Sequence, residues 1–178
     1  KEELEAKTDG KIKVSIFPGG QLGSDETTID DMRLGTLDMV IGATTNAAPF
    51  MPEVQVFGLS YLFKDKESFE SILEKGSPVY NKVESYYKDK DLGLKLLALS
   101  GGGVRNVSNN KKPITSPDDL QGMKMRITSS PIESKIWATL GVLPTSLPFN
   151  EVYSAVQTGV AEAFESTISS YASSKLYE

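Results

Sequence analysis

The fold class is decided by residues 116–165, which read SPDDLQGMKMRITSSPIESKIWATLGVLPTSLPFNEVYSAVQTGVAEAFE. Short apolar stretches with strand patterning alternate here with segments that carry helix start and stop signals. The clearest start is Ser130 followed by Pro131, a capping residue with proline at the first helical position. Alternating strands and helices of this length predict an α/β protein with mainly parallel sheets.

The same alternation extends to both ends of the chain. The predicted strands span residues 11–17, 37–41, 92–99, 104–108, 123–128, 143–147 and 160–165. The predicted helices span residues 24–35, 65–76, 78–87, 116–122, 130–141, 150–159 and 168–176, and residues 4–7 read as the last turns of another. Because a helix ends so close to residue 1, we expect an internal fragment of a longer protein; the alternative is a processed or trimmed domain.

The composition excludes several classes of function. The 178 residues include no His and no Cys, which rules out Ser-His-Asp catalysis, cysteine nucleophiles, disulfides and zinc sites built on either residue. Lys and Arg number 19 against 24 Asp and Glu, for a net charge of −5. This balance argues against nucleic acid as the main partner. No apolar run approaches the roughly 20 residues of a membrane span. We expect no metal, no cofactor and no membrane insertion.

Arg126 is the strongest single candidate for a binding residue. It lies near the carboxyl end of a predicted strand, on the face opposite Met123, Met125 and Ile127, and a helix begins shortly after it at Ser130. Ligands of open α/β sheets bind beyond the carboxyl ends of strands, and a helix N-terminus favours anions. Arg126 could therefore hold a carboxylate with two parallel hydrogen bonds. The alternative is a solvent-facing arginine on an ordinary strand.

Three further side chains could support such a site. Arg105 follows a glycine run and is either a second cation for the same ligand or, more simply, a surface arginine. Glu165 ends an apolar strand and is either an ion-pair partner, which we favour, or a ligand residue. Phe149 and Trp137 are more simply core residues, and Phe149 is the better pocket candidate of the two because it precedes a helix. The glycine runs FPGGQLGS and SGGGV match no phosphate-binding motif and read as turns and a hinge.

Five stretches resemble the DctP-type solute-binding proteins of tripartite ATP-independent periplasmic (TRAP) transporters. They are GKIKVSIFPGGQLGSDETTIDDMRLGTLDMVI, LSYLFKDKESFESIL, GGGVRNVSNNKKPITSPDDLQGMKMRI, LGVLPTSLPFNEVYSAVQTGVAEAFES and YASSKLYE. The resemblance implies a two-lobe periplasmic binding protein fold, type II-like and incomplete at both ends. Residues 1–103 would form most of lobe I and residues 104–178 part of lobe II, with a hinge near 100–104. The N-terminal strand and the C-terminal region of the family would be missing.

The resemblance also implies a function. Such a protein captures a small organic acid in the cleft between its lobes and delivers it to the membrane subunits of the transporter, without catalysis. Its location would be periplasmic, with a signal peptide in the full-length precursor. A ligand-sensing module of the same fold is the main alternative. An enzyme acting on an acidic substrate is the other, and it lacks an obvious catalytic set.

The resemblance assigns site residues as well. Arg126, in GMKMRI, matches the family arginine that pairs with the ligand carboxylate, and Arg105 matches a second arginine that often contributes. The other positions that it places at the ligand are Phe149, Glu165, Thr44, Thr45, Phe63 and Ser166. Ser166 is a departure, because many members carry an asparagine there that commonly bonds the ligand. A hydroxyl is shorter than a carboxamide, so we expect the ligand pocket near Ser166 to differ from that of members with the asparagine.

Overall fold

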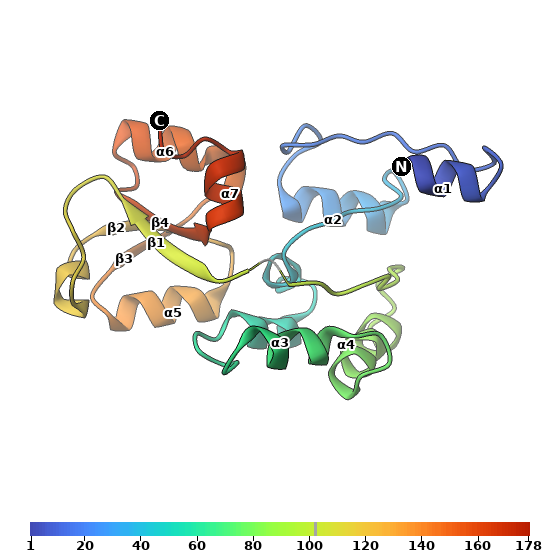
Figure 1. The fold of residues 1–178 in the computed structure, drawn as a ribbon, viewed down its shortest axis with the longest axis horizontal. Coiled ribbons are helices and arrows are strands. Elements are labelled where there is room, and N and C mark those ends of the chain that lie inside the picture. The colour runs from blue at the N-terminus through green and yellow to red at the C-terminus, as the bar shows by residue number, and fades with distance from the viewer. Residues whose placement is uncertain (102) are drawn as a thin grey trace.

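The computed structural model describes residues 1–101 and 103–178 (Figure 1). Gly102, inside the predicted hinge, lies outside the described residues. The second half of the chain builds a four-stranded mixed sheet with the order β1-β4-β2-β3. Its strands are β1 (Arg105–Asn109), β2 (Lys124–Ile127), β3 (Leu143–Ser146) and β4 (Ala163–Thr167). The predicted α/β class is therefore confirmed.

Strand direction fixes where a site can form in this sheet. β2 pairs in parallel with both β3 and β4, whereas β1 pairs antiparallel with β4. The register places Arg126 opposite Phe164 and opposite Thr145. Because the three parallel strands end at one edge of the sheet, the segments that follow them meet there.

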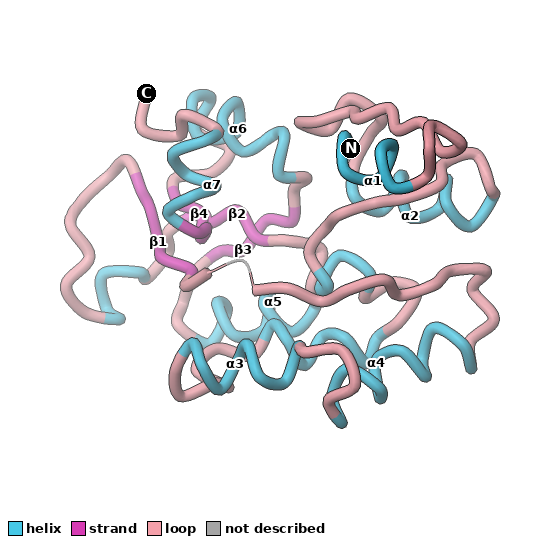
Figure 2. The backbone as a smooth tube through the Cα atoms, turned by 45° about the vertical axis from the view of Figure 1, so that its right-hand side comes forward, coloured by secondary structure: helices cyan, strands magenta, loops and turns pink. Residues whose placement is uncertain are grey.

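Helices cover both faces of this sheet. α5 (Pro131–Thr139) lies on one side, and α6 (Val152–Thr158) and α7 (Ile168–Ser173) lie on the other (Figures 1 and 2). Two short 3₁₀ helices, η3 (Pro117–Leu120) and η4 (Phe149–Glu151), lead into β2 and α6. The α5 side holds the apolar core of this half: Val107, Ile114, Leu120, Met123, Met125, Ile127, Trp137, Leu140, Val142 and Ala163.

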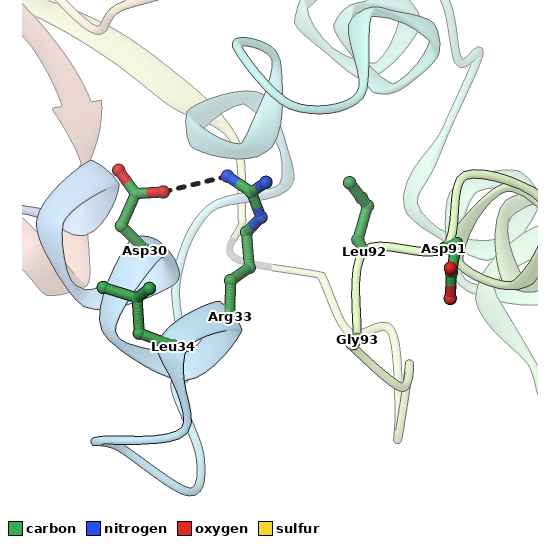
Figure 3. A pocket seen from close by; sticks show the side chains of 6 residues that line it. All are labelled: Asp30, Arg33, Leu34, Asp91, Leu92 and Gly93. Atoms are coloured by element: carbon green, nitrogen blue, oxygen red, sulfur yellow. Dashed lines mark hydrogen bonds and ion pairs between the residues drawn. The ribbon is translucent and has the colours of Figure 1, made fainter.

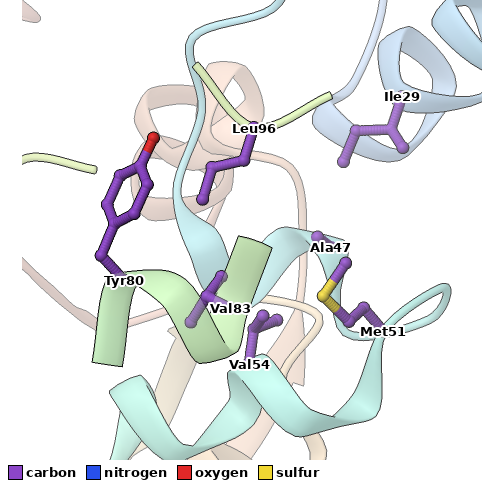
Figure 4. Close-up of a cluster of buried hydrophobic side chains, with 7 residues drawn as sticks. All are labelled: Ile29, Ala47, Met51, Val54, Tyr80, Val83 and Leu96. Carbon is purple, nitrogen blue, oxygen red and sulfur yellow. The ribbon is translucent and has the colours of Figure 1, made fainter. Parts of the chain in front are cut away.

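Residues 1–101 form a separate set of helices. These are α1 (Glu2–Lys7), α2 (Asp25–Leu34), η1 (Thr44–Ala47), η2 (Pro52–Gly58), α3 (Lys66–Leu73) and α4 (Pro78–Asp89). The predicted starts at Ser24 and Asp65 are confirmed, and Ser77 caps the helix predicted from residue 78; each of these side chains accepts a hydrogen bond from the backbone N–H three residues later. A hollow lies between α2 and the loop after α4 (Figure 3). The core joins α2, η1, η2, α4 and the segment after α4 through Ile29, Ala47, Met51, Val54, Tyr80, Val83 and Leu96 (Figure 4).

Three strand predictions in this half are wrong. Residues 11–17, 37–41 and 92–99 form no strand and run as loops (Figure 2). A strand requires a neighbour that pairs with its backbone N–H and C=O groups, and no part of residues 1–101 provides one in this structure. Much of their apolar pattern is accordingly exposed, at Ile12, Ile16, Phe17, Met39, Ile41 and Leu97. The apolar pattern identified extended segments, but it carries no information about whether a neighbouring strand is available to pair with them.

Two smaller differences concern helix type and start. Residues 116–122 form only the 3₁₀ turn η3, and Asn150 lies inside η4 instead of capping α6. The predicted stop at Gly159 is correct, because this residue ends α6 in the left-handed conformation at φ 76°. Across the described ranges 1–101 and 103–178, no helix has the length and apolar character needed to cross a membrane.

Candidate ligand-binding site

Arg126 lies at the carboxyl edge of the sheet, on β2. It is only 4% exposed, so the solvent-facing alternative is wrong. Its Nε donates to the backbone carbonyl of Leu147 over 2.8 Å, and its guanidinium carbon lies 5.6 Å from the centre of the Phe149 ring. Both partners follow β3, the neighbouring parallel strand. The arginine is thus fixed by groups that meet only at the ends of the strands.

The charge of Arg126 is only partly compensated. Among the described residues, no carboxylate lies within ion-pair distance of its guanidinium. Burial lowers the pKa of Arg126, the negative charge of Glu165 raises it, and the positive charge of Arg105 lowers it. The Nε–H of Arg126 is bound to the protein, so the other N–H groups of its guanidinium can donate hydrogen bonds to a ligand carboxylate.

Arg105 and Glu165 form an ion pair on the neighbouring strands β1 and β4. The Arg105 guanidinium contacts both carboxylate oxygens of Glu165, with Nη2 at 2.5 Å from Oε1, and it also donates to the Glu165 carbonyl over 3.2 Å. Glu165 is 6% exposed, whereas the Arg105 side chain is half-exposed. The favoured interpretation of Glu165 as an ion-pair partner is confirmed.

Glu133 adds a second buried carboxylate beside this pair. It lies in the first turn of α5 and accepts a hydrogen bond from the Thr128 hydroxyl over 2.6 Å. Burial raises the pKa of Glu133, and the charge of Glu165 raises it further, while the bond from Thr128 and the charge of Arg105 lower it. The edge of the sheet therefore holds a compact set of opposite charges around Arg126.

The facing wall comes from the N-terminal half of the chain. Asp25 and Glu26, in the first turn of α2, line the same small hollow as Arg126, together with Asn46. Asn46 donates to the Asp25 carboxylate, and Ser129 donates to the Glu26 carboxylate across the hollow. Two segments separated by about a hundred residues of sequence thus enclose one polar cleft, and we call it the Arg126 cleft.

The other predicted positions are distributed unevenly. Ser166 is buried on β4, two residues beyond Phe164, so strand alternation puts it on the face of Arg126. Thr45 is buried in η1 beside Asn46, and Thr44 is next to it. Phe63 packs on Phe69 of α3, with ring centres 4.9 Å apart. Like Ser166, Thr44 and Thr45, it is not among the residues that line the Arg126 cleft.

The sequence analysis missed Asp25 and Glu26, which form an acidic wall of the cleft, and the hydroxyl groups that face them. Asp25 and Glu26 read as ordinary first-turn acids of a helix, which the dipole alone explains. Thr128, Ser129 and Asn46 gave no local pattern at all. The available hint was that two acids start a helix directly after the glycine-containing loop FPGGQLGS.

The larger hollow in Figure 3, of about 360 Å³, is a weaker candidate. Its wall includes Arg33, which is paired with Asp30 at 3.0 Å and stacked on Phe50 at 4.9 Å from the ring centre. Asp91, Leu92 and Gly93 complete it from the loop after α4. Its cation is already engaged, so the chemistry favours the smaller Arg126 cleft.

The whole chain, residues 1–178, matches the family model described as bacterial extracellular solute-binding protein, family 7, or DctP. The chain belongs to this family. The resemblance seen in the sequence is therefore confirmed. The C4-dicarboxylate-binding periplasmic protein DctP of Rhodobacter capsulatus is 34% identical over 181 residues, which cover 99% of this chain and 52% of that protein.

Solved structures of DctP-family TRAP proteins share the fold. A TRAP periplasmic solute-binding protein from Polaromonas sp. JS666, bound to D-erythronate, is 30% identical with a TM-score of 0.91 over 98% of this chain and 56% of that one. The sugar acid binding protein DctPAm from Advenella mimigardefordensis, in complex with galactonate, is 29% identical with a TM-score of 0.92 over 99% and 56%. The chain spans about half the length of the relatives it matches.

Proposed function

We propose that this chain forms the acid-binding part of an extracytoplasmic solute-binding protein of a TRAP transporter. A small organic acid enters the Arg126 cleft, and its carboxylate pairs with the free N–H groups of Arg126. Residues 1–103 and 104–178 act as two lobes that close about a hinge near 100–104. The loaded protein then delivers the acid to the membrane subunits of the transporter.

The single observation that carries this proposal is the state of Arg126. A guanidinium that is 4% exposed and lacks an ion-pair partner among the described residues is costly to keep buried. A ligand carboxylate would supply the missing charge in a bidentate geometry. Ligands without a carboxylate would leave it unpaired, which gives the site its selectivity. The names of the similar proteins, which bind dicarboxylates, erythronate and galactonate, support the same class of ligand.

The remaining predicted residues have supporting roles in this proposal. Phe149 shields the guanidinium of Arg126 from water, and Ser166, Thr44 and Thr45, which lie outside the lining of the cleft, supply hydroxyls to the ligand. Arg105 holds the Glu165 carboxylate in place through their ion pair. Phe63 holds α3 in place through Phe69. We infer binding without turnover, because the cleft offers no His or Cys and the family is named for binding.

Calorimetry on the full-length protein tests the proposal with erythronate, galactonate and succinate as probes. Arg126→Ala should weaken binding of the acid by about thirtyfold or more, since truncating one partner of a buried charge pair costs about 2–5 kcal/mol. Arg126→Lys should lose the bidentate geometry and weaken binding by less. Lys124→Ala, an exposed cation on the same strand, is the control and should bind normally. Unchanged affinity in Arg126→Ala would refute the proposal.

A further inference from the structure

We propose that Asp25 and Glu26 make the Arg126 cleft selective for a polyhydroxy monocarboxylate over the matching dicarboxylate. The inference rests on the proposed function, because it takes Arg126 as the partner of the ligand's carboxylate. Family membership leaves this question open, since similar proteins are named for both C4-dicarboxylates and sugar acids. The distinction has to come from side chains of this chain.

The geometry sets two acids against one cation across the same hollow. Asp25, Glu26 and Asn46 line it from the N-terminal half, and Arg126, Thr128 and Ser129 line it from the sheet. A ligand whose carboxylate meets Arg126 therefore has both acids beside it. Arg126 itself indicates that a ligand binds here, because it is buried and has no ion-pair partner among the described residues.

The hydrogen-bonding chemistry of this wall suits hydroxyl groups. Ionised Asp25 and Glu26 only accept hydrogen bonds, and a ligand hydroxyl can donate to them. The structure already contains such bonds, since the Ser129 and Ser24 hydroxyls donate to Glu26 and the Asn46 amide donates to Asp25. Hydroxyls along the ligand would replace or extend these contacts. Thr128 and Ser129 offer further hydroxyl partners beside Arg126.

The charge around the cleft disfavours a second carboxylate. The negative groups in and near the cleft are the carboxylates of Asp25, Glu26, Glu133 and Glu165, and the positive groups are Arg105 and Arg126. Arg105 is already paired with Glu165. Burial raises the pKa of Asp25 and the charge of Glu26 raises it too, against the hydrogen bond from Asn46 and the charge of Arg126, which lower it. A neutral polyol tail avoids this repulsion, whereas a terminal carboxylate would meet both acids directly.

Matched pairs of acids test the inference, because oxidation of the terminal alcohol changes only the far end of the ligand. The pairs are erythronate with meso-tartrate, galactonate with galactarate, and gluconate with glucarate, measured by calorimetry on the full-length protein. For any pair that binds, the monocarboxylate should bind at least about tenfold more tightly, because the second carboxylate of the dicarboxylate would be repelled by Asp25 and Glu26.

Amide variants then locate the cause. Asp25→Asn with Glu26→Gln keeps the size of both side chains and removes their charge, so monocarboxylate affinity should fall while dicarboxylate affinity rises. The preference should therefore shrink to about threefold or less. Asp30→Asn is the control, since this exposed acid lies on the same helix but outside the cleft, and the preference should persist in it.

Each result has a distinct meaning. A dicarboxylate that binds as tightly as its partner, or a preference that survives in the double variant, overturns the inference. The proposed function stands in that case, provided that Arg126→Ala loses both ligands. If none of these acids binds, or if Arg126→Ala binds them normally, the proposed function fails and the inference falls with it.

Discussion

Glu165 shows how one buried carboxylate organises two arginines. It is bound by Arg105 on the adjacent strand and lies close enough to Arg126 to influence that arginine's charge. Without it, the like charges of Arg105 and Arg126 would be less compensated. Glu165 therefore lets Arg126 remain charged and buried before any acid arrives.

We expect Glu165→Gln to destabilise the ligand-free protein by about 1–2 kcal/mol, allowing for the partial exposure of Arg105. A bound acid restores some of the lost negative charge, so the loss should be smaller at saturating ligand. Urea unfolding measures the free energy of unfolding without ligand and with the acid that binds most tightly in the calorimetric tests. Glu151→Gln, an exposed glutamate in η4, is the control and should change neither. Equal losses with and without ligand would contradict this role.

At the scale of elements, short-range hydrogen bonds decide where segments begin. The turn η3 leads the chain into β2, and Asp119 fastens its start. One oxygen of Asp119 accepts hydrogen bonds from the backbone N–H groups of Thr115 and Ser116, each at 2.9 Å. These bonds lower the pKa of Asp119 from 3.8 to about 2, with the Thr115 backbone as the largest cause.

This shift predicts a dependence on pH. A carboxyl with a lowered folded-state pKa contributes stability above its ordinary pKa of 3.8, and the contribution is lost as the pH falls through about 2. Asp119→Asn should therefore lower the melting temperature at neutral pH, and the gap to the parent protein should narrow below 3.8. Thermal unfolding across this range measures it, with Asp118→Asn as the neighbouring control. A gap that stays constant down to the lowest pH would show that the charge is not responsible.

At the scale of the whole molecule, the two halves of the chain touch beside the Arg126 cleft. Gly58, at the end of η2, lies against the start of α5. A side chain there would come within 3.2 Å of Ile132, 3.4 Å of Thr45 and 3.5 Å of Ser130. The backbones approach closely at this point because Gly58 has no Cβ, which sets the spacing of the cleft walls.

Gly58→Ala should accordingly lower the unfolding free energy by about 1 kcal/mol, since the added methyl overpacks this contact. It should also weaken acid binding several-fold, because the walls move apart. Gly42→Ala is a matched control, as its new methyl would make only ordinary contacts at 3.6 Å or more. Chemical unfolding and calorimetry on both variants give the comparison. Equal behaviour of the two would mean that the contact at Gly58 is not tight.

The sequence alone determined those features that depend on neighbours within about ten residues. Caps such as Ser24, Asp65 and Ser77 act three residues along the chain, so the starts of α2, α3 and α4 could be predicted closely. Apolar alternation likewise located the four strands of the sheet. Arg126 could be selected as the leading candidate because strand end and helix start are adjacent in the chain.

Only the tertiary structure decided the features that join distant segments. The pair of Arg105 and Glu165 spans 60 residues, and the contact of Glu26 with Ser129 spans 103. No local pattern encodes such contacts, because side-chain spacing repeats over a turn of helix or two residues of strand. For the same reason, the patterning predicted strands within residues 11–99 that have no pairing neighbour, and it could not reveal the acidic wall that faces Arg126.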